Sequence, residues 1–234
     1  MKKFQLTLLT LAFGGIVSFA QSADDILNKH IEAMGGAKWK TIKTVKLTGV
    51  MSQGGVDITM SETIKNNEWS RTDISAAGQS GYVLVTQKEG WMYMPFLGQT
   101  KPEAMSAEDV SLSKDKLNYS YQLLVDKGGI KSSTMAGKDS VDSKPCFKLK
   151  IKTTDGNEIS AFFDCKTYFL SKVSTMVKVE GTEQEVAVTY GDYKKQPEGV
   201  FIPMTMGTTQ GDLHFTAVEL NKPYGDEYLK HETN

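Results

Sequence analysis

Short alternating segments separated by turns constrain this chain more than any other feature of its sequence. From residue 45 onward, apolar and polar residues alternate over successive runs, and glycine, asparagine or Asp-Gly turns separate these runs. Such alternation is typical of antiparallel strands with one buried face, joined as a meander. It predicts a mainly β protein of about 11 strands, and a sheet of that size normally curls or closes. We therefore expect an open or incomplete antiparallel β-barrel.

One helix is expected before the first strand. Residues 24–34 place apolar side chains at helical spacing, and Ser22 with Asp25 three positions later resembles a capping box. Gly35 and Gly36 then stop the helix. This pattern predicts an amphipathic helix that packs against the sheet.

A second departure from alternation lies at residues 103–127. Ser106 is a candidate helix cap, and Leu117, Tyr121 and Leu124 share one helical face. We expect one or two helices here, inserted into an otherwise β chain.

The first residues predict a secretory signal peptide. Lys2 and Lys3 precede an apolar run that is too short for a membrane anchor, and small residues allow cleavage after Ala20 or after Ala23. No cysteine lies near these positions, so no lipid anchor is expected. We assign residues 1–20 to the signal peptide and expect the mature protein in the periplasm.

The rest of the chain, residues 21–234, contains no linker, charge block or internal repeat, and we expect a single domain. Loss of the signal peptide takes the formal net charge from −1 to about −3, which argues against nucleic acid and against a polybasic membrane surface. No second apolar run approaches the length of a membrane helix. We expect a monomer.

Two cysteines in an exported chain suggest a disulfide. A two-residue Asp-Gly loop at residues 155–156 would pair the strands 145–153 and 158–165 so that Cys146 faces Cys165. An oxidising compartment favours the bridge. The alternative is a pair of free buried thiols.

Residues 91–97, Trp-Met-Tyr-Met-Pro-Phe-Leu, carry no charge and do not alternate. A strand in a barrel with an apolar lumen would have this composition, and the many methionines suit a cavity whose contents vary in shape. The alternative is an ordinary core in which methionine fills gaps. The candidate cavity residues on the strands are Met60, Val85, Trp91, Tyr93 and Phe96.

Several segments together resemble a known family. The chain is similar to the LolA/LolB-like lipoprotein-carrier superfamily, particularly the LolA-like outer membrane lipoprotein-sorting proteins of Bacteroidetes. The likeness covers nearly the whole mature chain and is carried by residues 24–51, 90–106, 168–174, 188–204 and 218–229. It implies an incomplete barrel closed by helices, around an apolar cavity that takes the acyl chains of lipoproteins.

From this resemblance we expect a carrier for a lipid or an acylated lipoprotein, with membrane-bound release and acceptor proteins as further partners. Residues 103–127 would form the lid, and Leu117, Tyr121 and Leu124 would fill the mouth of the barrel until an acyl chain displaces them. The alternative is an interaction or scaffold protein with the same fold, a filled core and no ligand.

One feature departs from the family pattern. The functional arginine of the carriers lies in the turn before the third strand, where this chain has Asn66 and Asn67. Arg71 is the only arginine in the sequence and lies inside that strand. It is a candidate to bond carbonyls of the lid or of a ligand. The alternative is a surface residue paired with Asp73 or Glu62.

The sequence favours a protein that is not an enzyme. His30, His214 and His231 are far apart along the chain, and no nucleophile elbow, zinc-protease or phosphate-loop motif occurs. No metal site and no cofactor are expected.

Overall fold

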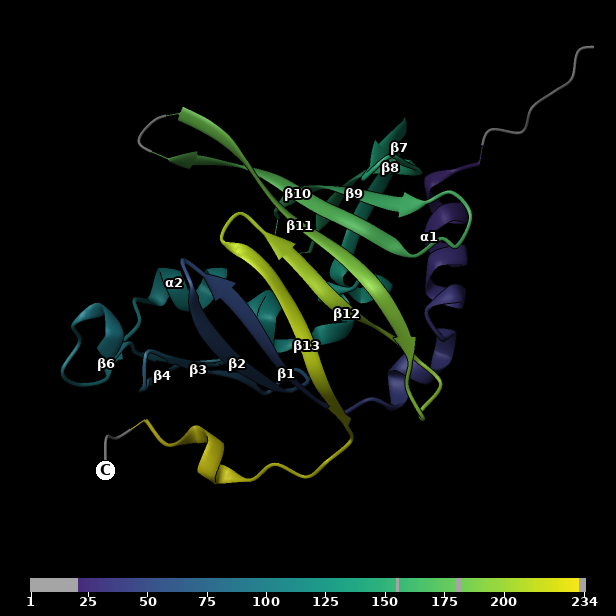
Figure 1. The fold of residues 1–234 in the computed structure, drawn as a ribbon. Coiled ribbons are helices and arrows are strands. Elements are labelled where there is room, and N and C mark those ends of the chain that lie inside the picture. The colour runs from purple at the N-terminus through teal and green to yellow at the C-terminus, as the bar shows by residue number, and fades with distance from the viewer. Residues whose placement is uncertain (1–20, 155, 180–181, 232–234) are drawn as a thin grey trace, which may run out of the picture.

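The computed structural model describes residues 21–154, 156–179 and 182–231, and the predicted signal peptide lies outside them. The described residues form one antiparallel sheet of 13 strands in the order β6-β5-β4-β3-β2-β1-β13-β12-β11-β10-β9-β8-β7 (Figure 1). The strands are β1 (Thr44–Gln53), β2 (Val56–Lys65), β3 (Trp69–Ala76), β4 (Gln79–Thr86), β5 (Gly90–Tyr93), β6 (Glu103–Ala104), β7 (Ile130–Val141), β8 (Lys144–Thr153), β9 (Glu158–Asp164), β10 (Leu170–Val179), β11 (Thr182–Lys195), β12 (Phe201–Thr208) and β13 (Gly211–Leu220).

The sheet is open, because β6 and β7 form its two edges. Strand β1 pairs with both β2 and β13, which joins the first and last strands in the middle of the sheet. This arrangement confirms the predicted open antiparallel barrel. The structure has more strands than expected, partly because β6 contains two residues, too few for alternation to be recognised.

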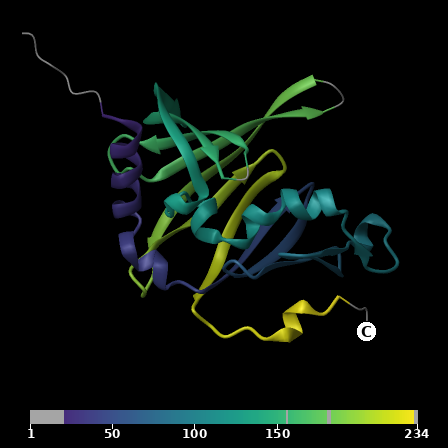
Figure 2. The same cartoon turned by 180° about the vertical axis from the view of Figure 1, so that it is seen from behind.

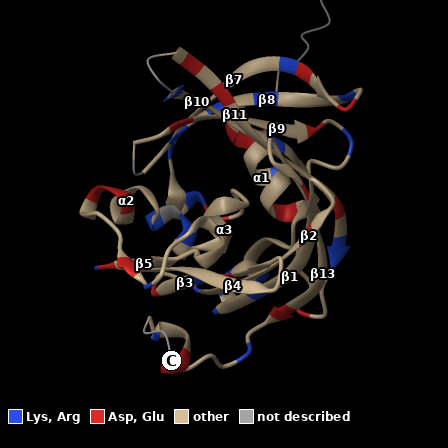
Figure 3. Cartoon of the chain, turned by 60° about the vertical axis from the view of Figure 1, so that its left-hand side comes forward, with Lys and Arg blue, Asp and Glu red and all other residues tan. Residues whose placement is uncertain are grey.

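Helical segments lie inside the curve of the sheet. They are α1 (Ala23–Ala33) and, between β6 and β7, α2 (Ala107–Leu112), η3 (Lys114–Leu117), α3 (Tyr119–Gln122) and η4 (Lys127–Gly129). Figure 3 looks along the sheet and shows α1 and α3 surrounded by strands, with α2 on the open side. In Figure 2 both helical regions lie in front of the sheet. The predicted insertion at residues 103–127 is thus helical, but it is divided into short turns.

Helix α1 begins where the sequence predicts. The Ser22 hydroxyl accepts the Asp25 N–H at 3.1 Å, and the Asp25 carboxylate accepts the Ser22 N–H at 3.1 Å. This capping box satisfies two N–H groups that the first helical turn leaves unpaired. Gly35 follows the helix at φ 122°, and a Cβ there would lie 2.9 Å from the Gly199 oxygen. Only glycine permits this turn and this close approach.

Two clusters of buried side chains fill the space between sheet and helices. The first joins β1, β2, β12 and β13 to α3, and the second joins α1 to β8, β9 and β10. Members of the first include Val45, Leu47, Ile64, Tyr119, Leu123, Ile202 and Phe215, and members of the second include Ile26, Leu27, Leu149, Ala161 and Phe163.

Strand register defines the two faces of the sheet. Residues that are directly opposed on antiparallel strands point to the same side. Val45 is opposed to Ile64 and both lie in the first core cluster, so this side is the concave face. Their neighbours Lys46 and Thr63 are opposed on the convex face. The same rule assigns a side to residues on every paired strand.

The apolar stretch at residues 91–97 differs from the prediction. Strand β5 ends at Tyr93, and Pro95–Leu97 form a 3-10 turn, η2. Proline lacks the N–H that a continued ladder requires, and its fixed φ suits the first turn of a helix. The stretch is therefore half strand and half turn, and Leu97 at the turn is largely exposed.

Candidate functional site

A group of apolar side chains on the concave face is only partly covered. We call this group the concave wall. It consists of Ile58, Met60, Ile74, Val83 and Met92 on β2 to β5, and of Val186, Val188, Met206 and Leu213 on β11 to β13.

The register across β2, β1, β13 and β12 places these side chains in one row. Met51 is opposed to Ile58 on one side and to Leu213 on the other, and Leu213 is opposed to Met206. Met51 is buried, whereas its neighbours in the row are half-buried. The row therefore joins a buried side chain to partly exposed ones, and all of its members are apolar.

Exposure along the wall rises toward its rim. Met92 is 37% exposed and Val186 is 42% exposed, although both point to the inner side of a curved sheet. Contiguous apolar side chains left open on a concave surface are typical of sites that bind an apolar partner.

The helical segment between β6 and β7 packs in the interior beside the concave wall. Leu117, Leu123 and Leu124 are each at most 4% exposed, and Leu123 belongs to the first core cluster together with Tyr119. Met206 and Leu213 of the wall pack against the same cluster. We call residues 105–125 the lid, because their apolar side chains occupy the interior that the sheet encloses.

The turn between β2 and β3 holds the lid. The Asn67 N–H donates to the Leu117 oxygen at 2.6 Å, and the Asn118 side-chain amide donates to the Asn67 side-chain oxygen at 2.9 Å. The Asn66 side-chain oxygen accepts the Tyr119 N–H at 3.2 Å. We call this set of bonds the asparagine latch. Sequence reasoning did not assign this latch.

The outer half of the lid contacts β5 through a glycine. The Met105 N–H donates to the Gly90 oxygen at 2.8 Å. A Cβ at Gly90 would lie 2.6 Å from the Met105 sulfur and 3.2 Å from a methyl group of Val110. The absence of a side chain at this position allows α2 to lie close to the sheet.

Tyr119 places a polar atom in the apolar interior. Its hydroxyl is buried and has no hydrogen-bond partner among the described residues. Burial raises the pKa of Tyr119 well above its usual value, and the nearby Glu62 carboxylate raises it further. The phenol therefore stays neutral, and it adds no charge to the apolar interior.

His30 connects α1 to the lid. Its ring is fully buried, with Nδ1 2.8 Å from the Tyr168 oxygen and Nε2 2.9 Å from the Leu123 oxygen. A neutral imidazole can donate to only one of these two carbonyls, whereas an imidazolium could donate to both. Burial nevertheless lowers the pKa of His30 from its ordinary value, against the opposing effect of the two carbonyls.

The structure brings five of the predicted cavity residues to the interior. Met60 lies on the concave wall, and Val85 is buried on the same face of β4. Leu117 and Leu124 are buried in the lid, and Tyr121 is half-buried at its end. Sequence reasoning missed the wall residues on β11, β12 and β13, which strand alternation alone could have identified.

Trp91 and Tyr93 lie on the convex face instead. Val85 is opposed to Gly90 and Leu84 is opposed to Trp91. The expectation that Trp91 and Tyr93 share a wall with Val85 is wrong, because the turn between β4 and β5 sets the opposite register. Phe96, in the η2 turn after β5, is half-buried.

Arg71 also points away from the lid. It lies on the convex face, where its Nε donates to the Asp73 carboxylate at 2.8 Å. Its Nη1 donates to the main-chain oxygens of Tyr228 at 3.3 Å and Lys230 at 2.7 Å. The pairing with Asp73 is the alternative that the sequence left open, and the carbonyls that Arg71 binds belong to the C-terminal segment.

The predicted disulfide is not present. Cys146 and Cys165 are free thiols, and Cys146 is opposed to Asp164. The hairpin loop is longer than the two residues expected, because Thr153 rather than Thr154 bonds Asn157 at the end of the ladder. A shift of one residue moves a side chain to the other face of a sheet. Cys146 accordingly packs with Val141 and Phe162, away from the second core cluster that Cys165 contacts.

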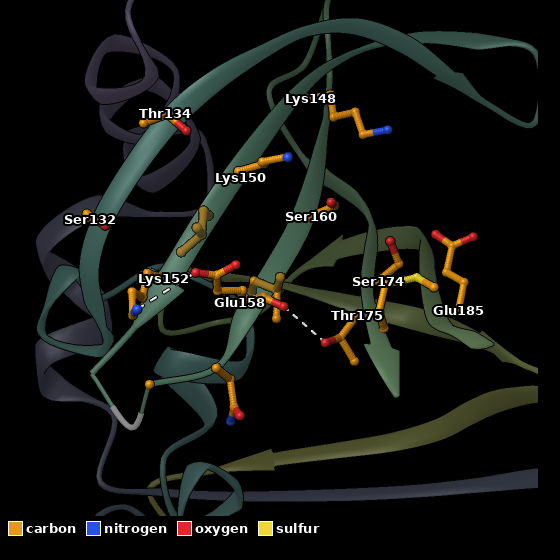
Figure 4. Close-up of a pocket in the computed structure, with 15 residues that line it drawn as sticks. Ser132, Thr134, Lys148, Lys150, Lys152, Glu158, Ser160, Ser174, Thr175 and Glu185 are labelled. Carbon is orange, nitrogen blue, oxygen red and sulfur yellow. Dashed lines mark hydrogen bonds and ion pairs between the residues drawn. The ribbon is translucent and has the colours of Figure 1, made fainter. Parts of the chain in front are cut away.

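A hollow of about 750 Å³ lies on the convex side of β7 to β10 (Figure 4). Lys148, Lys150 and Lys152 line it together with serine and threonine hydroxyls. Lys148 pairs with Asp139 at 3.3 Å and Lys152 with Glu158 at 3.7 Å. These ion pairs offset much of the positive charge, so this hollow is a polar surface and a weaker candidate than the concave wall.

Within residues 21–154, 156–179 and 182–231, no group of three or more histidine, cysteine, aspartate or glutamate side chains is placed to hold a metal ion. No helix in the same residues is both long and apolar enough to cross a membrane.

Solved structures with the same architecture identify the fold of this chain. A LolA superfamily protein from Nitrosomonas europaea superposes with a TM-score of 0.55 and 15% identity, over 90% of this chain and 98% of the other. This protein has a LolA-like fold. A DUF1329 family protein from Desulfovibrio piger gives 0.57 at 12% identity, over 91% of this chain and 98% of its own length. A putative outer membrane lipoprotein-sorting protein domain from Vibrio parahaemolyticus gives 0.52 at 12% identity, covering 87% and 94%.

No protein-family model matches the chain, and no curated protein sequence matches it. The likeness is therefore one of three-dimensional structure. It supports the resemblance found in the sequence and shows the fold.

Proposed function

We propose that this protein is a carrier that holds the acyl chain of a lipid or an acylated lipoprotein against its concave wall. The observation that carries the proposal is the exposure of Met92 and Val186 on the inner face of the sheet. An apolar surface inside a LolA-like fold suits an extended hydrocarbon better than it suits a polar substrate. The lipoprotein-sorting domain from Vibrio parahaemolyticus supports the choice of cargo.

Exchange between lid and ligand makes such binding reversible. Removing Leu117, Leu123 and Leu124 from the interior costs about 2 kcal/mol for each side chain, or about 6 kcal/mol in all. Burying about eight methylene groups returns about 0.8 kcal/mol each, or about 6 kcal/mol. An acyl chain can therefore replace the lid side chains without becoming trapped.

Two substitutions on one hairpin test the proposal. Val186→Glu adds a charge to the concave face of β11, and Met176→Glu adds the same charge to the convex face of β10, where the side chain is 58% exposed. Both sites are open to solvent, so neither change should disturb folding. A fluorescent fatty acid is titrated into each purified mature protein.

The proposal predicts saturable binding to the wild type, a loss of at least tenfold in affinity for Val186→Glu, and no change for Met176→Glu. Equal affinity in both variants would place the ligand elsewhere. The absence of any binding to the folded wild type would refute a carrier and favour the alternative, a scaffold protein with a filled core.

The same proposal includes export to the periplasm and partners in the membrane that load and receive the cargo. Cleavage after Ala20 would keep Ser22, whose side chain caps α1, whereas cleavage after Ala23 would remove this cap. We therefore expect the mature protein to begin at Gln21. The mass of the exported protein tests this expectation.

A further inference from the structure

The segment after β13 crosses the convex face of the sheet. We call residues 222–231 the strap, which includes the 3-10 turn η5 (Asp226–Leu229). Figure 1 shows it in yellow, running back from β13 toward the edge of the sheet, and Figure 3 shows it on the side opposite α3. The strap is thus separated from the lid by the sheet itself.

The surface beneath the strap is one row of opposed residues. Lys46 on β1 faces Thr63, Thr63 faces Arg71, Arg71 faces Leu84, and Leu84 faces Trp91 on β5. Because opposed residues share a side, these five form a continuous track across five strands. We call it the convex groove, flanked by the buried rings of Trp69 and Tyr82.

The groove binds the strap through its main chain. The Arg71 guanidinium donates to the oxygens of Tyr228 and Lys230, and the Tyr82 hydroxyl donates to the oxygen of His231 at 2.6 Å. Main-chain oxygens are available in any extended peptide. These contacts therefore do not require the sequence of the strap.

Aromatic rings supply the remaining contacts. Tyr228 stacks on Trp69 with ring centroids 5.5 Å apart, and His231 stacks on Trp91 at 4.0 Å. Lys46 lies 5.9 Å from the ring centre of Tyr228. The groove thus selects two flat rings three positions apart, which is a simple requirement for a peptide.

The strap does not satisfy the groove. The Thr63 hydroxyl and the Trp91 indole N–H are buried beneath it and lack hydrogen-bond partners among the described residues, and so does the Tyr224 hydroxyl of the strap itself. Thr63 is 0% exposed. Each buried polar group left unpaired costs about 1–3 kcal/mol. The strap therefore binds less tightly than its contacts suggest.

We propose that the convex groove is a peptide-binding site and that the strap is its removable internal occupant. The ligand class is an extended peptide segment of another protein, with two aromatic residues three positions apart. The Arg71 guanidinium and the unpaired donors of Thr63 and Trp91 match the main-chain carbonyl acceptors of such a peptide. The strap itself carries two acids and two lysines, so the contacts that hold it are the rings and the main-chain oxygens. This site is independent of the acyl-chain site on the other face.

A labelled synthetic peptide of residues 221–231 tests the groove in the full-length mature protein. A tethered strap acts at an effective concentration in the millimolar range, so the wild type should bind the free peptide poorly. The double variant Tyr228→Ser/His231→Ser loosens the strap and leaves the groove unchanged. It should bind the peptide at least tenfold more tightly than the wild type, as measured by fluorescence anisotropy.

Three controls define the recognition. In the double variant with the loosened strap, adding Trp69→Leu or the milder Arg71→Lys should remove most of the gain in peptide affinity. Adding Leu97→Ser, at an exposed turn, should leave that gain unchanged. A peptide in which the residues equivalent to Tyr228 and His231 are serine should not bind.

Several results would overturn the proposal. One is a loosened variant, folded by circular dichroism, that binds the peptide no better than the wild type. Another is binding that persists in both groove variants. Dimerisation of the loosened protein in place of peptide binding would assign the groove to a second copy of the chain. Unchanged fatty-acid binding throughout is expected, because the acyl-chain site lies on the opposite face.

Discussion

Weakening the asparagine latch should increase the affinity for an acyl ligand. The Asn118 side chain donates to Asn67 at 2.9 Å and accepts the Ser120 N–H at 3.0 Å as the cap of α3. Asn118→Ala removes both bonds. The lost cap costs about 1 kcal/mol and the lost latch bond about 1 kcal/mol. The closed lid is therefore destabilised by about 2 kcal/mol relative to the sheet.

At 1.4 kcal/mol for each factor of ten, this change raises the equilibrium constant for lid opening about 30-fold. If the ligand binds only the open form, its apparent affinity rises by the same factor while the open form is rare. Fluorescent fatty-acid titration measures the affinity, and amide hydrogen exchange at Tyr121 and Leu123 measures the opening. Ser22→Ala is the matched control, because it removes a cap on α1 and should leave the affinity unchanged.

Faster exchange at Tyr121 and Leu123 without a gain in affinity would show that the lid does not control access to the site. Unchanged exchange would show instead that the latch contributes little to lid closure. Either result would refute the link between latch strength and ligand uptake.

Two further predictions concern stability. Because burial lowers the pKa of His30 in the folded state, the unfolded chain binds a proton more readily below the ordinary pKa of about 6.5. The stability that neutral His30 contributes is therefore present above this pH and lost as the pH falls. Urea unfolding measures the free energy of unfolding at pH 5 and at pH 7.5. The difference between these two values should be smaller for His30→Gln than for the wild type. Gly35→Ala should lower the free energy of unfolding by about 3 kcal/mol, because φ is 122° and the Cβ would meet Val200 at 2.9 Å. Gly36→Ala, at φ 59° with open space around it, should cost about 1 kcal/mol, and thermal unfolding of both variants checks the order.

Local features of the fold could be predicted because their causes are local. The Ser22 capping box involves residues three positions apart, and the strand runs follow from alternation within each strand. The helical nature of residues 103–127 also follows from nearby caps and turns. The two-residue strand β6 could not be predicted, since nothing in two residues distinguishes a strand from a loop.

The candidate site could be predicted only in part, and the errors in that prediction have one source. Alternation separates Trp91 and Tyr93 from Met92, but it does not say which set points inward. The β4–β5 turn places Trp91 opposite Leu84 and so sends it to the convex face. The one-residue shift that separates Cys146 from Cys165 arose in the same way at the β8–β9 turn.

The sequence by itself therefore determined most of the strands and helices, where α1 begins, and that the strands form a curved antiparallel sheet. Only the tertiary structure decided that Met92 and Val186 lie on the concave face, that Asn66 and Asn67 hold the lid, and that the lone arginine binds the strap. Secondary structure depends on side-chain order along one segment. Which face lies inside depends on the register and curvature set by residues far apart in the chain.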